Sequence, residues 1–233
     1  MPSASKRYAI CHLPFSIFVF MIQSATGIIL RTRPLTETSL IVHWLTPKFG
    51  RMATVAKGAR RLKSPFHGKL DLFYLADFSF NRSRRSDLHL LREVSLRETH
   101  GPLRQDLVGL RQATYAAAFI EQATETETPL PAVFELMRGF LDYLCRQGPV
   151  PQAVFAFELK LLHELGLNPD LGRTGLTAGA RQIVRALMAG NWQASCYLKP
   201  TSGQIEELRR FLHGFLIFHL GRLPRGRAAA LAG

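Results

Sequence analysis

The chain has 233 residues, of which 47% are hydrophobic and 20% are charged, and its formal net charge at pH 7 is +13. These proportions exclude an intrinsically disordered chain and leave room for one large domain or two small ones. A positive surplus of this size favours a partner that carries phosphates, either a nucleic acid or an anionic membrane surface, unless the source proteome is simply rich in arginine.

The positive charge is concentrated in the first half of the chain. Residues 21–98 contain 14 Lys and Arg against 6 Asp and Glu, whereas residues 99–233 contain 14 against 11. We therefore expect a polyanionic partner to meet the first half.

Residues 1–20 are interpreted as an extension that lies outside the folded domains. The apolar stretch Tyr8–Ile22 follows two basic residues, as in a signal peptide, but His12 and Pro14 interrupt it and it is too short to span a bilayer. Met21 lies directly before the first expected strand, so an upstream start codon or a non-essential extension is favoured. An export signal is the alternative.

Five short segments between residues 26 and 96 have the alternation and composition of β-strands. They are expected at Gly27–Arg33, Ser39–Thr46, Arg51–Lys57, Leu70–Phe80 and Leu88–Leu96. Pro47–Gly50 has the composition of a turn, which would join the second and third strands as an antiparallel hairpin. Five closely spaced strands predict a small closed barrel. An OB-fold fits the strand count and the basic loops, and an SH3-like barrel fits almost as well.

The connection after the third strand has the densest positive charge. Gly58 allows the chain to leave the strand at positive φ without Cβ strain, and no acidic residue lies between Lys48 and Lys69. The leading candidates for phosphate contact are the four cations of this connection, Lys57, Arg60, Arg61 and Lys63.

Further candidates for phosphate contact lie near the first hairpin and in the turn before the fifth strand. They are Arg31, Arg33, Lys48 and Arg51 in the first group and Arg82, Arg84 and Arg85 in the second. Phe49 and Phe66 are candidates to stack on bases, which would contribute roughly 1–3 kcal/mol each. Trp44 lies in an apolar strand and is expected in the core.

After Glu98 the apolar residues recur at helical spacing. Helices are expected from Pro102 to about Ile120, over Val133–Leu144, over Pro151–Leu165, over Ile183–Met188 and over Thr201–Gly221, the last with a capping box at Thr201 and Gln204. Thr124–Thr128 is expected to be a solvated connection. We therefore expect an OB-fold over residues 21–98, followed by an all-α domain over residues 99–233.

No pattern in the chain indicates catalysis or a cofactor. It contains no phosphate-binding G-x-x-x-x-G-K-[ST] loop, no G-x-G-x-x-G and no His-Glu-x-x-His. Cys11, Cys145 and Cys196 form no C-x-x-C pair, which argues against a disulfide framework and a zinc ribbon and favours a reducing cytoplasm. We expect no enzyme activity, no cofactor and no metal.

Several segments, taken in order, resemble the bacterial RecO family of DNA repair proteins. They are Gly27–Pro34 with Glu37–Leu40, Thr46–Arg51, Ala56–Ser64, Glu164–Leu171 and Leu212–Pro224, and together they cover about residues 26–226. The resemblance implies an N-terminal OB-fold and a helical C-terminal domain, in agreement with the strand and helix patterns. Some members bind zinc through four cysteines after a mid-chain Pro-x-Leu, but Leu171–Gly175 contains none. Members usually start close to the first strand, which supports Met21 as the start.

The resemblance also implies a function as a recombination mediator in the cytoplasm, associated with the nucleoid. Such a protein binds single- and double-stranded DNA and anneals complementary strands, including strands coated by single-strand binding protein. Together with RecR it helps RecA to load at gaps, without hydrolysing a nucleotide. The helical domain would receive the tail of single-strand binding protein, at residues that the motifs do not assign. The alternatives are an RNA-binding or ribosome-associated OB protein and a membrane-surface protein anchored by Tyr8–Ile22.

Overall fold

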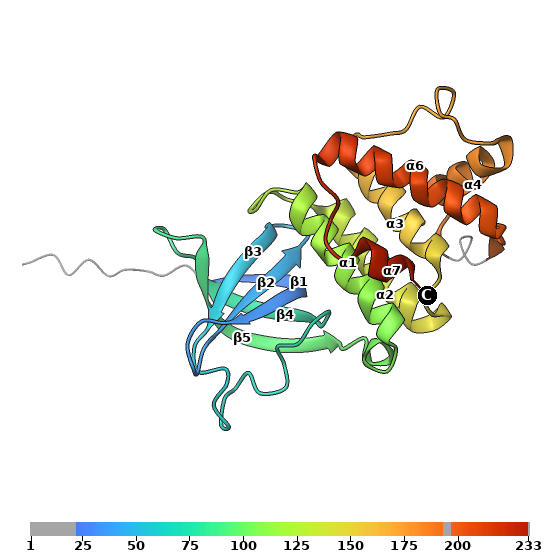
Figure 1. Ribbon diagram of the computed structural model, residues 1–233. Helices are drawn as coiled ribbons and strands as arrows, with labels where there is room; N and C mark the ends of the chain where they lie inside the picture. Colours follow the sequence, from blue (N-terminus) through green and yellow to red (C-terminus); the bar gives the residue numbers. More distant parts are fainter. Residues whose placement is uncertain (1–21, 193–196, 233) are drawn as a thin grey trace, which may run out of the picture.

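The computed structural model of the chain describes residues 22–192 and 197–232, which form a β-barrel followed by a group of packed helices (Figure 1). The expected extension at residues 1–20, Met21, Cys11 and Cys196 lie outside the described residues. Among the described residues, no helix is both long enough and apolar enough to cross a membrane.

The barrel consists of β1 (Ile22–Pro34), β2 (Leu40–Thr46), β3 (Gly50–Ala56), β4 (Leu75–Asn81) and β5 (Leu88–Glu98). The strands close in the order β1-β2-β3-β5-β4. The β3–β5 pair is parallel and the other pairs are antiparallel. A closed five-stranded ring with this Greek-key order is OB-like, so the predicted OB-fold is confirmed and the SH3-like alternative is not needed.

Two of the expected strand boundaries are wrong for identifiable reasons. β1 begins at Ile22, before the expected start, because Ile22–Ile28 pairs with β4 and closes the ring. β4 begins only at Leu75, because Phe73 has a φ of 63° and takes residues 70–74 out of the strand. The Phe73 amide instead donates to the carbonyl of Ile29 at 2.8 Å.

The barrel interior is aromatic. The rings of Trp44 and Phe78 are stacked with their centroids 4.1 Å apart, and Trp44 Nε1 donates to Thr54 Oγ1 at 2.8 Å. The hydrogen bond satisfies the polar group of a side chain that is completely buried. Trp44 is therefore a core residue, as expected.

The helical part contains η1 (Gly101–Arg104), α1 (Leu107–Ala123), α2 (Pro131–Gln147), α3 (Pro151–Glu164), α4 (Ala178–Ala189), α6 (Ser202–Leu220) and α7 (Arg227–Leu231). The helix expected from Pro102 is only a 3-10 turn, and α1 begins after Asp106, whose carboxylate accepts from the amides of Val108 and Gly109. The capping box of Thr201 and Gln204 at the start of α6 is confirmed.

A buried ionic cluster fastens α7 to α1 and α3. Arg227 donates from Nε to Glu158 Oε1 at 2.6 Å and from Nη2 to Glu158 Oε2 at 3.0 Å. The hydroxyl of Tyr115 donates to the same carboxylate. Burial and the Glu158 charge raise the pKa of Tyr115 well above its ordinary value. Burial alone would lower the pKa of Arg227, but the hydrogen bonds and the charge of Glu158 raise it.

The barrel and the helices share one apolar core. Ile28, Leu30, Leu45 and Phe73 from the barrel belong to the same buried cluster as the side chains of α1, α2 and α3. The carbonyl of Phe73 is 2.7 Å from Nδ1 of buried His100, which precedes η1. One outer face of the barrel is thus packed against helices.

Candidate nucleic-acid interface

The end loop, defined as residues 57–64, follows β3 at the end of the barrel that points away from the helices (Figure 1). Gly58 turns the chain at a φ of 67°, and its amide donates to Ser39 Oγ at 3.4 Å. The amide of Arg60 donates to the carbonyl of Thr38 at 3.0 Å. The backbone is held in this way, while the four cationic side chains, Lys57, Arg60, Arg61 and Lys63, are all exposed.

A second group of cations lies at the opposite end of β3. Lys48 precedes this seven-residue strand and Lys57 follows it, and a strand of this length spans about 20 Å. Lys48, Phe49 and Arg82 line one cavity of about 220 Å³. Arg84 and Arg85 follow Arg82 in the β4–β5 loop and are exposed. These eight predicted cations are therefore divided between the two ends of the barrel.

The remaining predicted arginines lie on the wall of the barrel at its junction with the helices. Arg31 Nε is 3.3 Å from Oε1 of Glu121 in α1. Arg51 Nε donates to Thr124 Oγ1 at 2.9 Å, and its Nη2 donates to the carbonyl of the same residue. Arg33 is exposed and lines a cavity together with Arg51. Arg31 and Arg51 thus connect the barrel to α1, in addition to the charge that they contribute.

His43 lies on β2 among these arginines. Burial, followed by the positive charges of Arg31, Arg33 and Arg51, lowers the pKa of His43 from 6.5 to about 4. Its Nε2 is buried and makes no hydrogen bond within residues 22–192 and 197–232. The imidazole is therefore neutral at pH 7, and it adds no positive charge to the junction.

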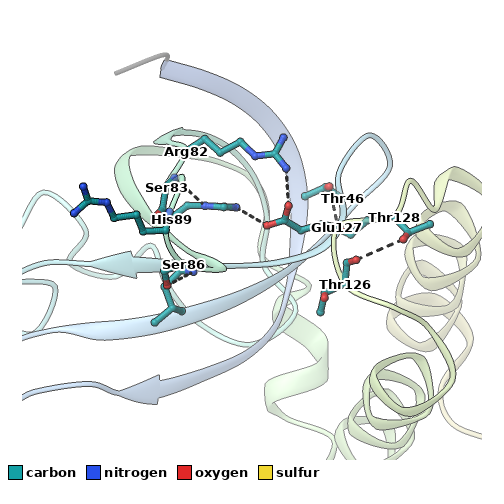
Figure 2. Close-up of polar contacts among 11 residues, drawn as sticks. Thr46, Arg82, Ser83, Ser86, His89, Thr126, Glu127 and Thr128 are labelled. Atoms are coloured by element: carbon teal, nitrogen blue, oxygen red, sulfur yellow. Dashed lines mark hydrogen bonds and ion pairs between the residues drawn. The ribbon is translucent and has the colours of Figure 1, made fainter. Parts of the chain in front are cut away.

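Glu127, in the α1–α2 connection, binds the β4–β5 region of the barrel (Figure 2). Its Oε2 is 2.6 Å from Arg82 Nη2, its Oε1 is 3.0 Å from His89 Nε2, and its amide donates to the Arg51 carbonyl at 2.8 Å. Most of the Thr124–Thr128 connection is exposed, as expected, but Glu127 within it is held by three groups of the barrel.

The two aromatic candidates differ in exposure. Phe49 is half-buried, its ring meets Phe80 edge-on at 5.6 Å, and Lys48 Nζ lies 5.2 Å from its centroid. Phe66 is only 7% exposed and packs in the barrel core. The expectation that Phe66 presents its ring to a base is wrong for this structure, because the turn after Ser64 directs the ring inward. Phe49 is the aromatic candidate that remains.

The sequence patterns missed the acidic residues that pair with the predicted cations. Glu121 and Glu127 are 90 and 45 residues away along the chain from Arg31 and Arg82, respectively. No periodicity or motif connects residues that far apart. Neither is next to the barrel in chain order, because η1 and α1 lie between β5 and these residues.

The described ranges contain no group of three or more His, Cys, Asp or Glu side chains that could hold a metal ion. The strands, the helices and the exposed cations described above define a protein of two parts. A basic OB-like barrel comes first, and a helical bundle follows it.

Comparison with known proteins identifies the family. Residues 21–100 match the family described as Recombination protein O N terminal, and residues 104–177 match Recombination protein O C terminal. A protein of Anaeromyxobacter sp. (strain K), named DNA repair protein RecO, is 31% identical over an alignment that covers 84% of this chain and 91% of the relative. A Rhodopirellula baltica protein of the same name is 34% identical, over 63% of this chain and 54% of the relative.

The chain belongs to the RecO family of DNA repair proteins, which are recombination mediators and not enzymes. The resemblance found in the sequence is therefore confirmed.

Proposed function

We propose that this RecO-family chain binds single- and double-stranded DNA through the cations of its barrel and anneals complementary strands. Together with RecR it helps to load RecA onto DNA coated by single-strand binding protein, whose tail the helical part receives. The protein acts in the cytoplasm, with the nucleoid. Its main support is the end loop, where four exposed cations lie on a backbone held by hydrogen bonds in a chain of this family.

Electrostatics explains how such a loop would bind DNA of any sequence. Each Lys or Arg that neutralises a phosphate releases condensed counterions, so the affinity falls steeply with salt, with a slope of about −0.7 per contact for single strands. The loop has no acidic residue to weaken this attraction. At the opposite end of the barrel, Glu127 neutralises part of the Arg82 charge, which makes the end loop the stronger candidate.

The test is fluorescence anisotropy with labelled oligonucleotides across a salt series, combined with annealing of complementary strands. We expect binding to both DNA forms, a steep salt slope and accelerated annealing. A preference for structured RNA without DNA annealing would instead support the RNA-binding alternative and overturn the proposal. Binding of RecR and of a peptide with the tail sequence of single-strand binding protein is measured by the same method.

A further inference from the structure

Leu62 is the most exposed large hydrophobic side chain among the described residues, at 92%. It lies in the middle of the end loop, between Arg61 and Lys63, which are also exposed. A leucine in this position contributes no packing to the fold. Single exposed hydrophobic residues are common and need no explanation by themselves. The surroundings of Leu62 are what set it apart.

The backbone on both sides of Leu62 is ordered by turns. The amide of Arg61 donates to the carbonyl of Gly58 at 3.1 Å, and the amide of Ser64 donates to the carbonyl of Arg61 at 3.0 Å. A buried side chain anchors the loop on each side, Ala59 before Leu62 and Phe66 after it. The loop therefore presents Leu62 on a fixed support, at little further cost in conformational entropy on binding.

Proteins that kink duplex DNA often combine basic side chains with an apolar side chain that inserts between base steps and partly unstacks them. The end loop has both parts, since Leu62 is flanked by cations that favour a polyanion. A membrane surface is disfavoured, because one leucine side chain buries far less apolar area than the acyl chain or amphipathic helix by which proteins attach to membranes.

We propose that Leu62 is an apolar wedge that inserts between neighbouring bases of a DNA strand held by the end-loop cations. This inference rests on the proposed DNA-binding function and adds a contact to the bases themselves. Insertion would unstack a base step, which leaves the base edges available to a complementary strand. Leu62 thus acts on base stacking, and its cationic neighbours act on phosphates.

The test compares Leu62→Ala with Leu107→Ala, a matched control at a leucine that is 61% exposed at the start of α1. The probe is a single-stranded oligonucleotide containing 2-aminopurine, whose fluorescence rises when the base is unstacked. We expect wild type and Leu107→Ala to bind with the same rise in fluorescence. We expect Leu62→Ala to lose the rise and to lose affinity on the order of tenfold, the scale set by the buried methyl groups it lacks.

The salt series separates this role from a phosphate contact. Leu62→Ala removes no charge, so its salt slope should equal that of wild type. Leu62→Met, which keeps an apolar side chain of similar size, should restore the fluorescence rise. Equal fluorescence and affinity for Leu62→Ala and wild type would overturn the wedge and leave the DNA-binding proposal intact. The wedge would also be overturned if Leu62→Ala bound DNA as wild type does but bound anionic phosphatidylserine vesicles more weakly than wild type. Failure of wild type to bind DNA at any salt concentration would overturn the proposed function itself.

Discussion

The carboxylate of Glu127 lies 2.6 Å from the guanidinium of Arg82, so a residue of the helical part neutralises a cation of the barrel. The pair is partly exposed, and a phosphate that approaches Arg82 must compete with Glu127 for it. The two residues lie far apart in the sequence. The fold brings them together, so that Glu127 lowers the net positive charge around Arg82.

Glu127→Gln should therefore strengthen DNA binding. The amide retains hydrogen-bonding atoms for Arg82 and His89 but removes the negative charge. Affinity should rise a few-fold at low salt, and the salt slope should steepen by up to about 0.7, the value of one phosphate contact on a single strand. Glu125→Gln, an exposed acid in the same connection, is the control, and it should bind as wild type. If Glu127→Gln, like Glu125→Gln, binds DNA with wild-type affinity, then DNA does not reach Arg82.

Charge reversal in the end loop should have the opposite effect. Arg60→Glu combined with Arg61→Glu should weaken DNA binding by at least tenfold at low salt and flatten the salt slope, because two phosphate contacts are lost. Circular dichroism should show an unchanged fold, since both side chains are exposed.

The control for the end-loop double variant is Arg173→Glu with Arg185→Glu. Both of these residues are exposed and lie outside the barrel, and the net charge changes equally. If the two double variants weaken binding to the same extent, then net charge and not the loop governs the affinity.

Phe49→Ala should weaken binding to single strands more than binding to duplexes. A stacked ring contributes roughly 1–3 kcal/mol per base, and bases in a duplex are already stacked on each other. Anisotropy with a single strand and with its duplex gives the comparison, and Phe218→Ala, at a phenylalanine that is 83% exposed on α6, is the control. An equal loss for both DNA forms would argue that Phe49 only supports Lys48.

Arg227→Met should destabilise the helical part strongly. It leaves the completely buried Glu158 carboxylate without its cation, and breaking a buried ion pair costs about 3–5 kcal/mol. Urea unfolding followed by circular dichroism measures the change. The double variant Glu158→Leu with Arg227→Met removes both charges and should recover most of the lost stability. If the single variant is as stable as wild type, then water or another group solvates Glu158.

The low pKa of His43 predicts a loss of stability in mild acid. The folded state holds the imidazole neutral down to about pH 4, whereas the unfolded chain takes up the proton near pH 6.5. The unfolded state therefore binds more protons between these values, and the free energy of unfolding falls as the pH is lowered from 6.5 to 4. His43→Gln should reduce this decrease, while His213→Gln, at an exposed histidine, should not. Urea unfolding at several pH values tests both.

Sequence patterns predicted the architecture because each element has a local signal. Alternation located the barrel strands, and the capping box located the start of α6. The errors arose where a distant group determines the local structure. Phe73 departs from the strand because its ring enters the core shared with the helices, and no alternation pattern contains that information.

The candidate site was predictable only as a list of cations. Lys48 and Lys57 were expected in two separate groups, and β3 does hold them at opposite ends of the barrel. The sequence did not separate Phe49 from Phe66, of which only Phe66 is buried. Which side chains stay exposed and which find acidic partners depends on contacts across the fold.

The core shared between the barrel and the helices has a consequence for how this protein can be divided. Ile28, Leu30, Leu45 and Phe73 are all at most 5% exposed, and they are buried in the same cluster as helical side chains. A fragment that ends at residue 98 would present these four side chains to water and invite aggregation. Cooperative unfolding in a single transition is the natural expectation for such a chain. Point variants in the intact protein, and not truncations, are the appropriate way to assign its activities to the barrel or to the helices.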